Sequence, residues 1–293
     1  MEASASSLLV ADRRVRRRKL VNRLMEVLAL TAALIAVAVL VLVVVSVVKR
    51  GASALDWDLI TKTPAFFGQP GGGISNAIVG SIVLVALATA LALPLGVLVA
   101  IFVSEFAPRP IASSIRLVLD VINGIPTIVT GIFIFTILVL AHGQSGFAGA
   151  CALGIIAMPL ISRATQEILF LVPASLREAG LALGATRWRT VLGIVLPTSL
   201  GGIVTGTTLA IARIAGETAP LLFTTSLTAQ TVTWDPRQPL QSIPLTIFQL
   251  AESADPEDHA RAWAAGIVLM GFVLLVSLLA RAVLARSRRK LAR

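Results

Sequence analysis

Long apolar runs with few charged residues dominate this sequence of 293 residues. No charged side chain occurs at residues 27–48, and none occurs in the longer stretch 121–162. A helix needs about 20 apolar residues to cross a bilayer. Only 14% of the residues are charged, whereas a soluble domain carries about 25%, so too few charges remain to cover a water-facing surface. The chain is therefore predicted to be a polytopic membrane protein.

The apolar runs predict an all-α fold with six transmembrane helices. The expected spans are residues 27–48, 76–104, 121–141, 146–162, 198–222 and 262–280. A signal peptide is the alternative for the first run, because Ala52-Ser53-Ala54 resembles a cleavage site, but a signal core holds only about 7–15 apolar residues. We therefore expect a basic arm at 1–23, a membrane domain at 24–285 and a basic tail at 286–293.

Lysine and arginine are distributed asymmetrically around these runs. The net charge is +10, and the cations cluster before the first span and after the last one. Because cytoplasmic segments are enriched in Lys and Arg, this bias predicts that both termini are cytoplasmic. The cations adjoin apolar runs and are not interleaved with aromatic residues. Their distribution therefore indicates contact with anionic membrane lipid and argues against a nucleic-acid partner.

The segment 171–197, between the fourth and fifth spans, is predicted to form a cytoplasmic helix-turn-helix. Pro173 ends the preceding helix. Ser175 and Glu178 have the spacing of a capping box that would start a short new helix. Gly184 suits the end of that helix, because glycine readily adopts the left-handed conformation of a C-terminal cap.

The short helix carries an apolar stripe. Leu176, Ala179 and Leu183 lie on one side, at the spacing of a helix that docks into a groove. A second helical stretch is expected from about residue 186 until Pro197. A connector that lies on the membrane surface is the alternative, and the pattern of residues leaves both interpretations open.

This loop resembles the signature of the permease subunits of bacterial ABC importers, E-A-A-x3-G-x9-I-x-L-P. The matching positions are Glu178, Ala179, Gly184, Ile194, Leu196 and Pro197, and Gly180 stands where the family has a second alanine. The resemblance implies a type I importer permease. It also implies that the 175–196 loop inserts into a cleft of an ATPase subunit and couples ATP hydrolysis to movement of the spans.

Three further segments, residues 103–107, 124–131 and 210–223, are similar to PstA-type permeases of bacterial phosphate importers. The resemblance implies import of inorganic phosphate across the bacterial plasma (inner) membrane, with this chain forming half of the pathway. Implied partners are a second, PstC-like permease, two PstB-like ATPase subunits that bind ATP and Mg, and an external PstS-like phosphate-binding protein. Open alternatives are a permease for phosphonate, sulfate or molybdate, an ATPase-independent carrier or channel, and a non-transporting membrane scaffold.

Arg213 and Glu217 are the only ionisable residues well inside a predicted span. At i and i+4 they share a helix face and can pair, and a charge within a membrane commonly marks a translocation pathway. We expect Arg213 to present its planar guanidinium to a passing oxyanion while Glu217 holds it in place. The alternative is that Arg213 and Glu217 face the protein interior and only neutralise each other's charge. Glu105, at the inner end of the second span, is expected to snorkel to water without a transport role.

Two glycines in the fifth predicted span are spaced for close helix packing. Gly202 and Gly206 form a G-x-x-x-G step, which predicts close helix packing either against a partner permease or within the chain. The sequence contains no G-x4-G-K-[S/T] loop for ATP, no H-x3-H or C-x2-C metal motif and no G-x-S-x-G nucleophile elbow. The chain is therefore expected to have no catalytic residues, to bind no metal or cofactor of its own, and not to be an enzyme by itself.

Overall fold

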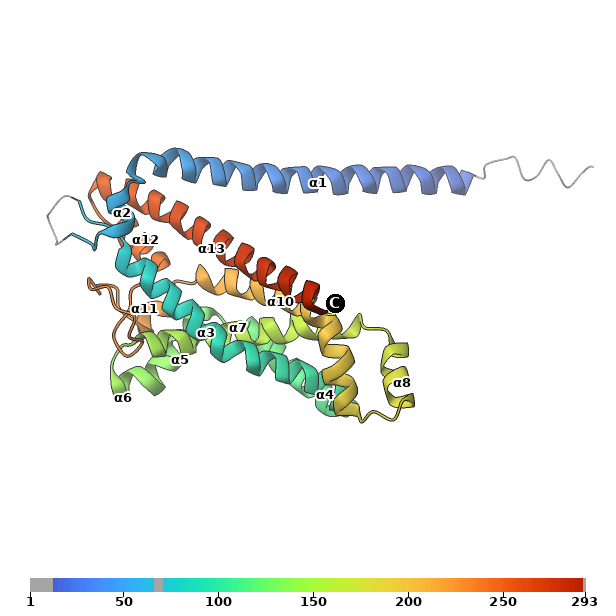
Figure 1. Ribbon diagram of the computed structural model, residues 1–293. Helices are drawn as coiled ribbons and strands as arrows, with labels where there is room; N and C mark the ends of the chain where they lie inside the picture. The colour runs from blue at the N-terminus through green and yellow to red at the C-terminus, as the bar shows by residue number, and fades with distance from the viewer. Residues whose placement is uncertain (1–12, 66–70, 292–293) are drawn as a thin grey trace, which may run out of the picture. The chain divides into compact units, whose positions relative to one another are not determined.

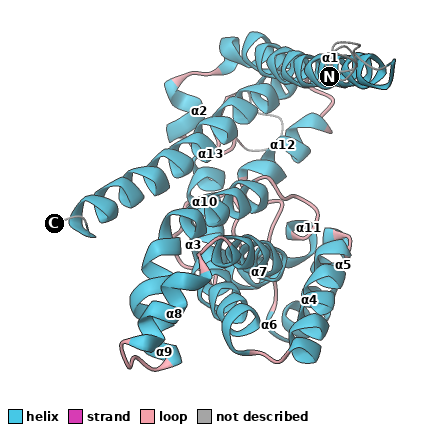
Figure 2. Cartoon of the chain, turned by 90° about the vertical axis from the view of Figure 1, so that its right-hand side faces the viewer, coloured by secondary structure: helices cyan, strands magenta, loops and turns pink. Residues whose placement is uncertain are grey.

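The computed structural model describes the backbone of residues 13–65 and 71–291, and these residues are almost entirely helical (Figures 1 and 2). The described residues contain no strand beyond an isolated bridge between Pro64 and Gly72. The chain divides into two units, residues 1–50 and residues 51–293. The all-α prediction is therefore confirmed, and each unit is described separately.

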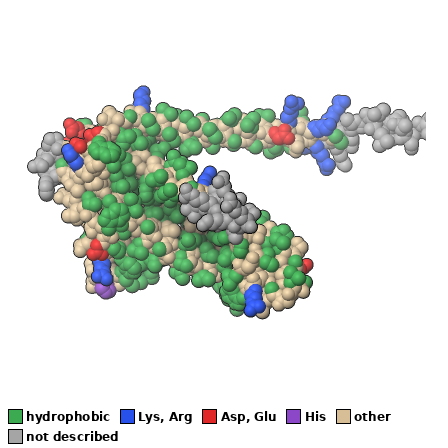
Figure 3. All heavy atoms as spheres, viewed as in Figure 1, with side chains coloured by type: hydrophobic (Ala, Val, Ile, Leu, Met, Phe, Trp, Pro, Cys, Tyr) green, Lys and Arg blue, Asp and Glu red, His purple; other side chains and the backbone are tan. Residues whose placement is uncertain are grey.

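The described part of the first unit is one long helix, α1 (Arg13–Gly51), whose last residue already belongs to the second unit. Hydrophobic side chains cover it between its charged ends (Figure 3). A helix that is apolar on all sides is typical of a membrane span, and α1 contains the predicted first span, residues 27–48. The helix starts well before that span, so part of the predicted basic arm is helical. Residues 1–12 of the arm and residues 292–293 of the predicted tail lie outside the described residues.

The second unit contains the remaining helices. Those of membrane-spanning length are α3 (Ser75–Ile101), α7 (Gly146–Phe170), α10 (Leu196–Ala215) and α13 (Pro256–Leu291). Shorter helices are α2 (Trp57–Thr61), α4 (Arg109–Gly124), α5 (Thr127–Ile134), α6 (Leu140–His142), α8 (Ala174–Ala182), α9 (Arg187–Thr190), α11 (Leu221–Thr224) and α12 (Ile243–Ala251). A 3₁₀ turn η2 (Ala52–Ala54) precedes α2, and π-helical turns occur at η3 (Phe102–Phe106), η4 (Phe135–Val139) and η5 (Val191–Val195).

Five of the described helices are long and apolar enough to cross a membrane, and a bent pair brings the number up to six. The bent pair corrects the prediction that 121–141 is one straight span. Its two halves, Arg109–Gly124 and Thr127–His142, meet at 94°. The break falls at Pro126, whose ring disfavours a helical conformation at the preceding Ile125, and Ile125 is extended, with φ −68° and ψ 131°.

The helix around the predicted fifth span, 198–222, is displaced toward the N-terminus. A continuous helix runs over Arg187–Ala215, so the expected stop at Pro197 is wrong. The π turn η5 precedes this proline, and a π turn is one way in which a helix changes its hydrogen-bond pattern without ending. The predicted end at 222 is also wrong, because Gly216 caps the helix directly after Ala215.

The core of the second unit lies around α7. The fully buried residues Leu84, Ala88 and Ala92 of α3, Ala150, Leu153 and Ala157 of α7, and Ala210 and Ile214 of α10 belong to one cluster. Many of these residues are small, which lets the helix backbones approach closely where lipid provides no hydrophobic driving force. Polar side-chain contacts between α4 and α7 include the ion pair Asp120–Arg163 and the hydrogen bond from Arg116 to Gln166. The Arg116 guanidinium also lies over the Phe170 ring, with its Cζ 5.4 Å from the centroid.

Gly202 and Gly206 face α7 within the chain. A Cβ atom at residue 202 would lie 2.5 Å from Ile168 Cδ1, and one at residue 206 would lie 2.5 Å from the Cβ atom of Ala164. Of the two packing arrangements open from the sequence, the structure uses this step for intrachain packing. This side of α10 is therefore covered by the chain's own helix.

Replacing Gly206 by alanine is expected to destabilise the packing of α10 on α7. The new methyl group cannot fit at 2.5 Å from Ala164, and overpacking of this kind costs about 1–3 kcal/mol. The melting temperature of the detergent-solubilised protein should fall. Gly271→Ala is the matched control, because a Cβ there meets no atom within 4 Å and alanine favours a helix by up to about 1 kcal/mol. Equal melting temperatures for the two variants would contradict the close approach.

Candidate functional site

The loop 171–197 folds into α8 and α9, at the opposite end of the second unit from α2 and α12 (Figure 1). Helix α8 begins at Ala174, with Pro173 as its N-cap and no side-chain capping bond. The predicted capping box of Ser175 and Glu178 is therefore wrong. Ser175 already lies within the first helical turn, so its hydroxyl is not at the position that caps the free N–H groups.

A Schellman motif ends α8, as glycine at residue 184 led us to expect. Gly184 has φ +80°, its N–H donates to the carbonyl of Leu181 at 2.9 Å, and the Ala185 N–H donates to Gly180 at 3.1 Å. These two bonds satisfy carbonyls at the helix end. The chain then reverses and enters α9, so the predicted helix-turn-helix is confirmed.

One face of α8 is exposed, and the opposite face is packed on the loop itself. Leu176 and Ala179 are exposed, and Leu183 is 88% exposed. Gly180 is buried, and a Cβ atom there would come within 2.9 Å of both Thr190 and Ile194. The glycine that replaces an alanine of the signature thus lets α8 pack closely on the helix that follows. Nothing in the local residue pattern indicated this contact.

Arg177 holds α8 onto the rest of the unit. Its guanidinium donates to Glu105, with Nη2 at 2.6 Å from Oε1 and Nε at 3.2 Å from Oε2. It also donates to the carbonyls of Leu169 at 2.8 Å and Val172 at 2.6 Å. Glu105 is only 6% exposed, so the prediction that it snorkels to water is wrong. The paired guanidinium supplies the hydrogen bonds that water would otherwise provide.

The residue after Glu105 makes a second contact with the loop. The Phe106 ring lies 4.6 Å from the Trp188 ring, centroid to centroid. The Arg187 guanidinium also lies over the Phe106 ring, with its Cζ 5.5 Å from the ring centroid. The end of the second span therefore contacts both α8 and α9. The family resemblance of 103–107 marked this segment, but nothing in the sequence indicated which residues it contacts.

Arg213 and Glu217 lie together at the other end of α10. Arg213 is in its last turn, and Glu217 follows the cap at Gly216, so the two do not share a face of one continuous helix as predicted. The turn nevertheless brings Arg213 Nε to 3.9 Å from Glu217 Oε1. The arginine side chain is 51% exposed and the glutamate side chain 17%. Arg213 is therefore paired with Glu217 while about half of its side chain stays exposed.

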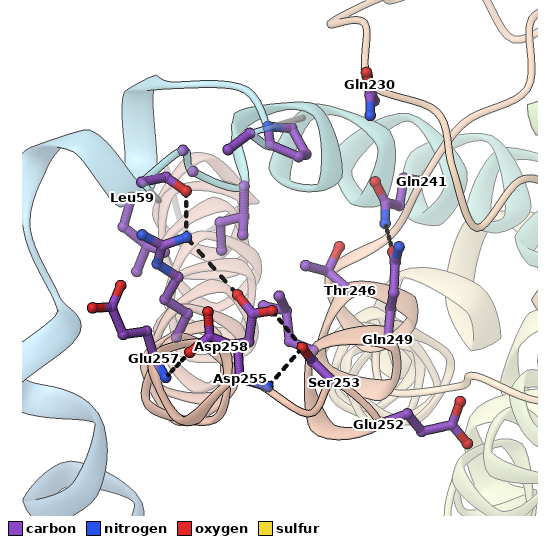
Figure 4. Close-up of a pocket in the computed structure, with 18 of the residues that line it drawn as sticks. Leu59, Gln230, Gln241, Thr246, Gln249, Glu252, Ser253, Asp255, Glu257 and Asp258 are labelled. Atoms are coloured by element: carbon purple, nitrogen blue, oxygen red, sulfur yellow. Dashed lines mark hydrogen bonds and ion pairs between the residues drawn. The ribbon is translucent and has the colours of Figure 1, made fainter. Parts of the chain in front are cut away.

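A separate cavity of about 870 Å³ lies between the 59–74 and 227–261 segments. In the wall of this cavity, Gln241 donates a hydrogen bond to Gln249, and Ser253 donates one to Asp258 (Figure 4). Among the described residues that line it, four are acidic, Glu252, Asp255, Glu257 and Asp258, and Arg261 is the single basic one. Because this charge repels an anion, the Arg213 region suits an oxyanion better than this cavity does.

The described residues contain no group of three or more His, Cys, Asp or Glu that could hold a metal ion.

Comparison with known proteins gives concordant matches. The sequence family described as "Binding-protein-dependent transport system inner membrane component" matches residues 92–289. The phosphate transport system permease protein PstA of Yersinia pestis is 39% identical over 273 residues, covering 92% of each chain. The probable PstA protein of Methanocaldococcus jannaschii is 34% identical over 244 residues, covering 83% of this chain and 86% of that protein.

Solved structures support the fold. A bacterial alginate ABC transporter, in complex with its alginate-bound periplasmic protein, aligns with a TM-score of 0.61 at 15% identity, over 92% of this chain and 96% of that chain. The MetNI methionine ABC transporter aligns with a TM-score of 0.57 at 18% identity, over 73% and 94%. Similarity in sequence and in fold leads to one assignment: this chain belongs to the PstA family of phosphate transport permeases, within the inner membrane components of binding-protein-dependent transport systems.

Proposed function

We propose that this chain is a transmembrane subunit of an ATP-driven importer of inorganic phosphate and forms half of the translocation pathway. Its relationship to the PstA proteins over most of its length carries the proposal. The exposed loop 171–197, which joins the ends of the long helices, gives further support. An ATPase subunit outside the membrane needs such a segment to transmit its movement to the helices. The chain has no phosphate-binding loop for ATP, so hydrolysis is assigned to partner subunits.

The proposed complex contains a second, PstC-like permease, two PstB-like ATPase subunits that bind ATP and Mg, and an external PstS-like phosphate-binding protein. Helix α8 is the segment that docks into the ATPase. Its support is the exposed apolar stripe of Leu176, Ala179 and Leu183, since an amphipathic helix docks by placing such a stripe in a groove. The distribution of Lys and Arg supports an orientation with both termini and α8 in the cytoplasm.

Phosphate is proposed to pass Arg213. A guanidinium suits a phosphate oxyanion because its planar N–H groups match pairs of oxygen atoms. Glu217 positions this side chain and, through its own negative charge, keeps the anion from binding too tightly. A conduction pathway requires both entry and release. The half-exposed position of Arg213 at the end of α10 supports this role.

Reconstitution of the complex in lipid vesicles tests the function directly. The phosphate-loaded binding protein should stimulate ATP hydrolysis and drive uptake of labelled phosphate, and unlabelled phosphate should compete better than sulfate, molybdate or phosphonate. Uptake of phosphate by this chain alone would favour an ATPase-independent carrier. Stronger competition by another oxyanion would overturn the proposed substrate.

Reversing the charge at Glu178 is expected to impair coupling. Glu178 is exposed on α8, and a like charge placed against a partner surface costs several kcal/mol. Uptake by the Glu178→Lys complex should therefore fall about tenfold or more, while the chain still inserts into the membrane. Glu26→Lys makes the same change on α1, at another exposed residue, and should transport normally. Normal uptake by Glu178→Lys would refute the docking role.

Arg213→Gln, which removes the positive charge, is expected to reduce phosphate uptake by about tenfold. This is the effect of losing one charge-assisted contact with a bound anion. Arg213→Lys keeps the charge but not the planar pair of donors, so it should retain an intermediate rate. Both variants should assemble at normal levels, as judged by copurification of the partner subunits. If Arg213→Gln left phosphate flux unchanged, the pair with Glu217 would only neutralise itself.

A further inference from the structure

Three elements meet at Arg177: α8, the C-terminal end of α7, and the π turn η3 that ends α3. The guanidinium makes hydrogen bonds to both carboxylate oxygens of Glu105 and to the carbonyls of Leu169 and Val172. A planar group with several fixed donors is suited to holding separate acceptors in one geometry. One side chain of the loop therefore joins the ends of two spanning helices.

Glu105 lies within the π turn η3, on the buried side of the chain. The Ala107 N–H donates to the carbonyl of Phe102 at 2.8 Å, which is the five-residue step of a π turn. Glu105 is four residues after the buried Ile101, and this spacing places both residues on one side of a helix. Val103 is buried as well, whereas Phe102 is exposed. The carboxylate is therefore buried where α3 meets the loop.

Apolar packing around the ion pair makes the joint stiff. Ala100 and Ile101 from α3, Leu169 and Val172 from the end of α7, and Val191 and Val195 from η5 form one buried cluster. Closely packed side chains transmit displacement instead of absorbing it. A buried ion pair that loses one partner leaves an uncompensated charge, so opening of this joint during a cycle is energetically unfavourable.

We infer that Glu105 and Arg177 form a permanent joint that makes α8, the end of α7 and the end of α3 move as one body, and that Glu105 is a positioning residue for coupling. The inference rests on the proposed function. It adds a route by which a push on α8 reaches α3, a helix that is separated from the loop in sequence and does not adjoin it along the chain. Without the joint, α8 moves mainly the helices to which the chain directly connects it.

The test uses Arg177→Lys in the assembled complex with its partner permease, ATPases and phosphate-binding protein in lipid vesicles. A lysine keeps the charge but cannot hold the carboxylate and both carbonyls in fixed directions. Phosphate imported per ATP hydrolysed should fall about fivefold or more, whereas ATP hydrolysis and the concentration of binding protein at half-maximal stimulation should stay near the wild-type values. Arg109→Lys, at an exposed position four residues after Glu105, is the matched control and should keep the normal ratio.

Glu105→Gln is the second variant, because it retains an acceptor but removes the charge from the other side of the joint. The amount of phosphate imported per ATP hydrolysed should fall in Glu105→Gln as it does in Arg177→Lys. Glu105→Asp should restore part of that ratio. A normal ratio of phosphate to ATP in Arg177→Lys, in a complex whose wild type is well coupled, would overturn the joint. Failure of the proposed function would look different, since the wild-type complex itself would then show no phosphate-dependent hydrolysis. If either variant failed to assemble, the other would decide the question.

Discussion

Close packing of α7 against α3 and α10 is the interaction on which the second unit depends. Helices surrounded by lipid gain little from burying apolar surface, so their association relies on contact at short range. Alanines along α3 and α7 and the glycines of α10 allow that contact. Because α7 is held on several sides, its C-terminal end is a fixed position, and the 171–197 loop starts from that position.

The arrangement at the loop follows from where buried charge can be tolerated. A carboxylate at 6% exposure is stable only with a partner that satisfies its lone pairs. Arg177 does so and also donates to the carbonyls of Leu169 and Val172, at and just after the end of α7. The same side chain therefore binds a helix end and a buried carboxylate, which connects the exposed surface of α8 to the membrane helices. Arg213 is the contrasting case, since its ion pair with Glu217 is longer, at 3.9 Å, and its side chain is half exposed.

Local patterns predicted much of the fold and the loop. Apolar run length indicated the spans, and Gly184 correctly indicated the turn after α8. Errors arose where a neighbour along the chain changed the local rule. Pro126 split a span that composition made continuous, and Pro197 failed to end a helix because the π turn η5 precedes it. π turns have no distinctive composition, so η5 could not be predicted. The burial of Glu105 could not be predicted either, because its partner Arg177 is distant in sequence.

Membrane insertion, helical class, the helix-turn-helix and family membership follow from residues close together in the chain, because run length, charge bias and motif spacing are local properties. The ion-pair partner of Glu105 and the residues that pack against Gly206 come from segments that are distant in sequence. Each of these contacts is set by backbone direction and packing in three dimensions. Such contacts exist only after the helices have packed together.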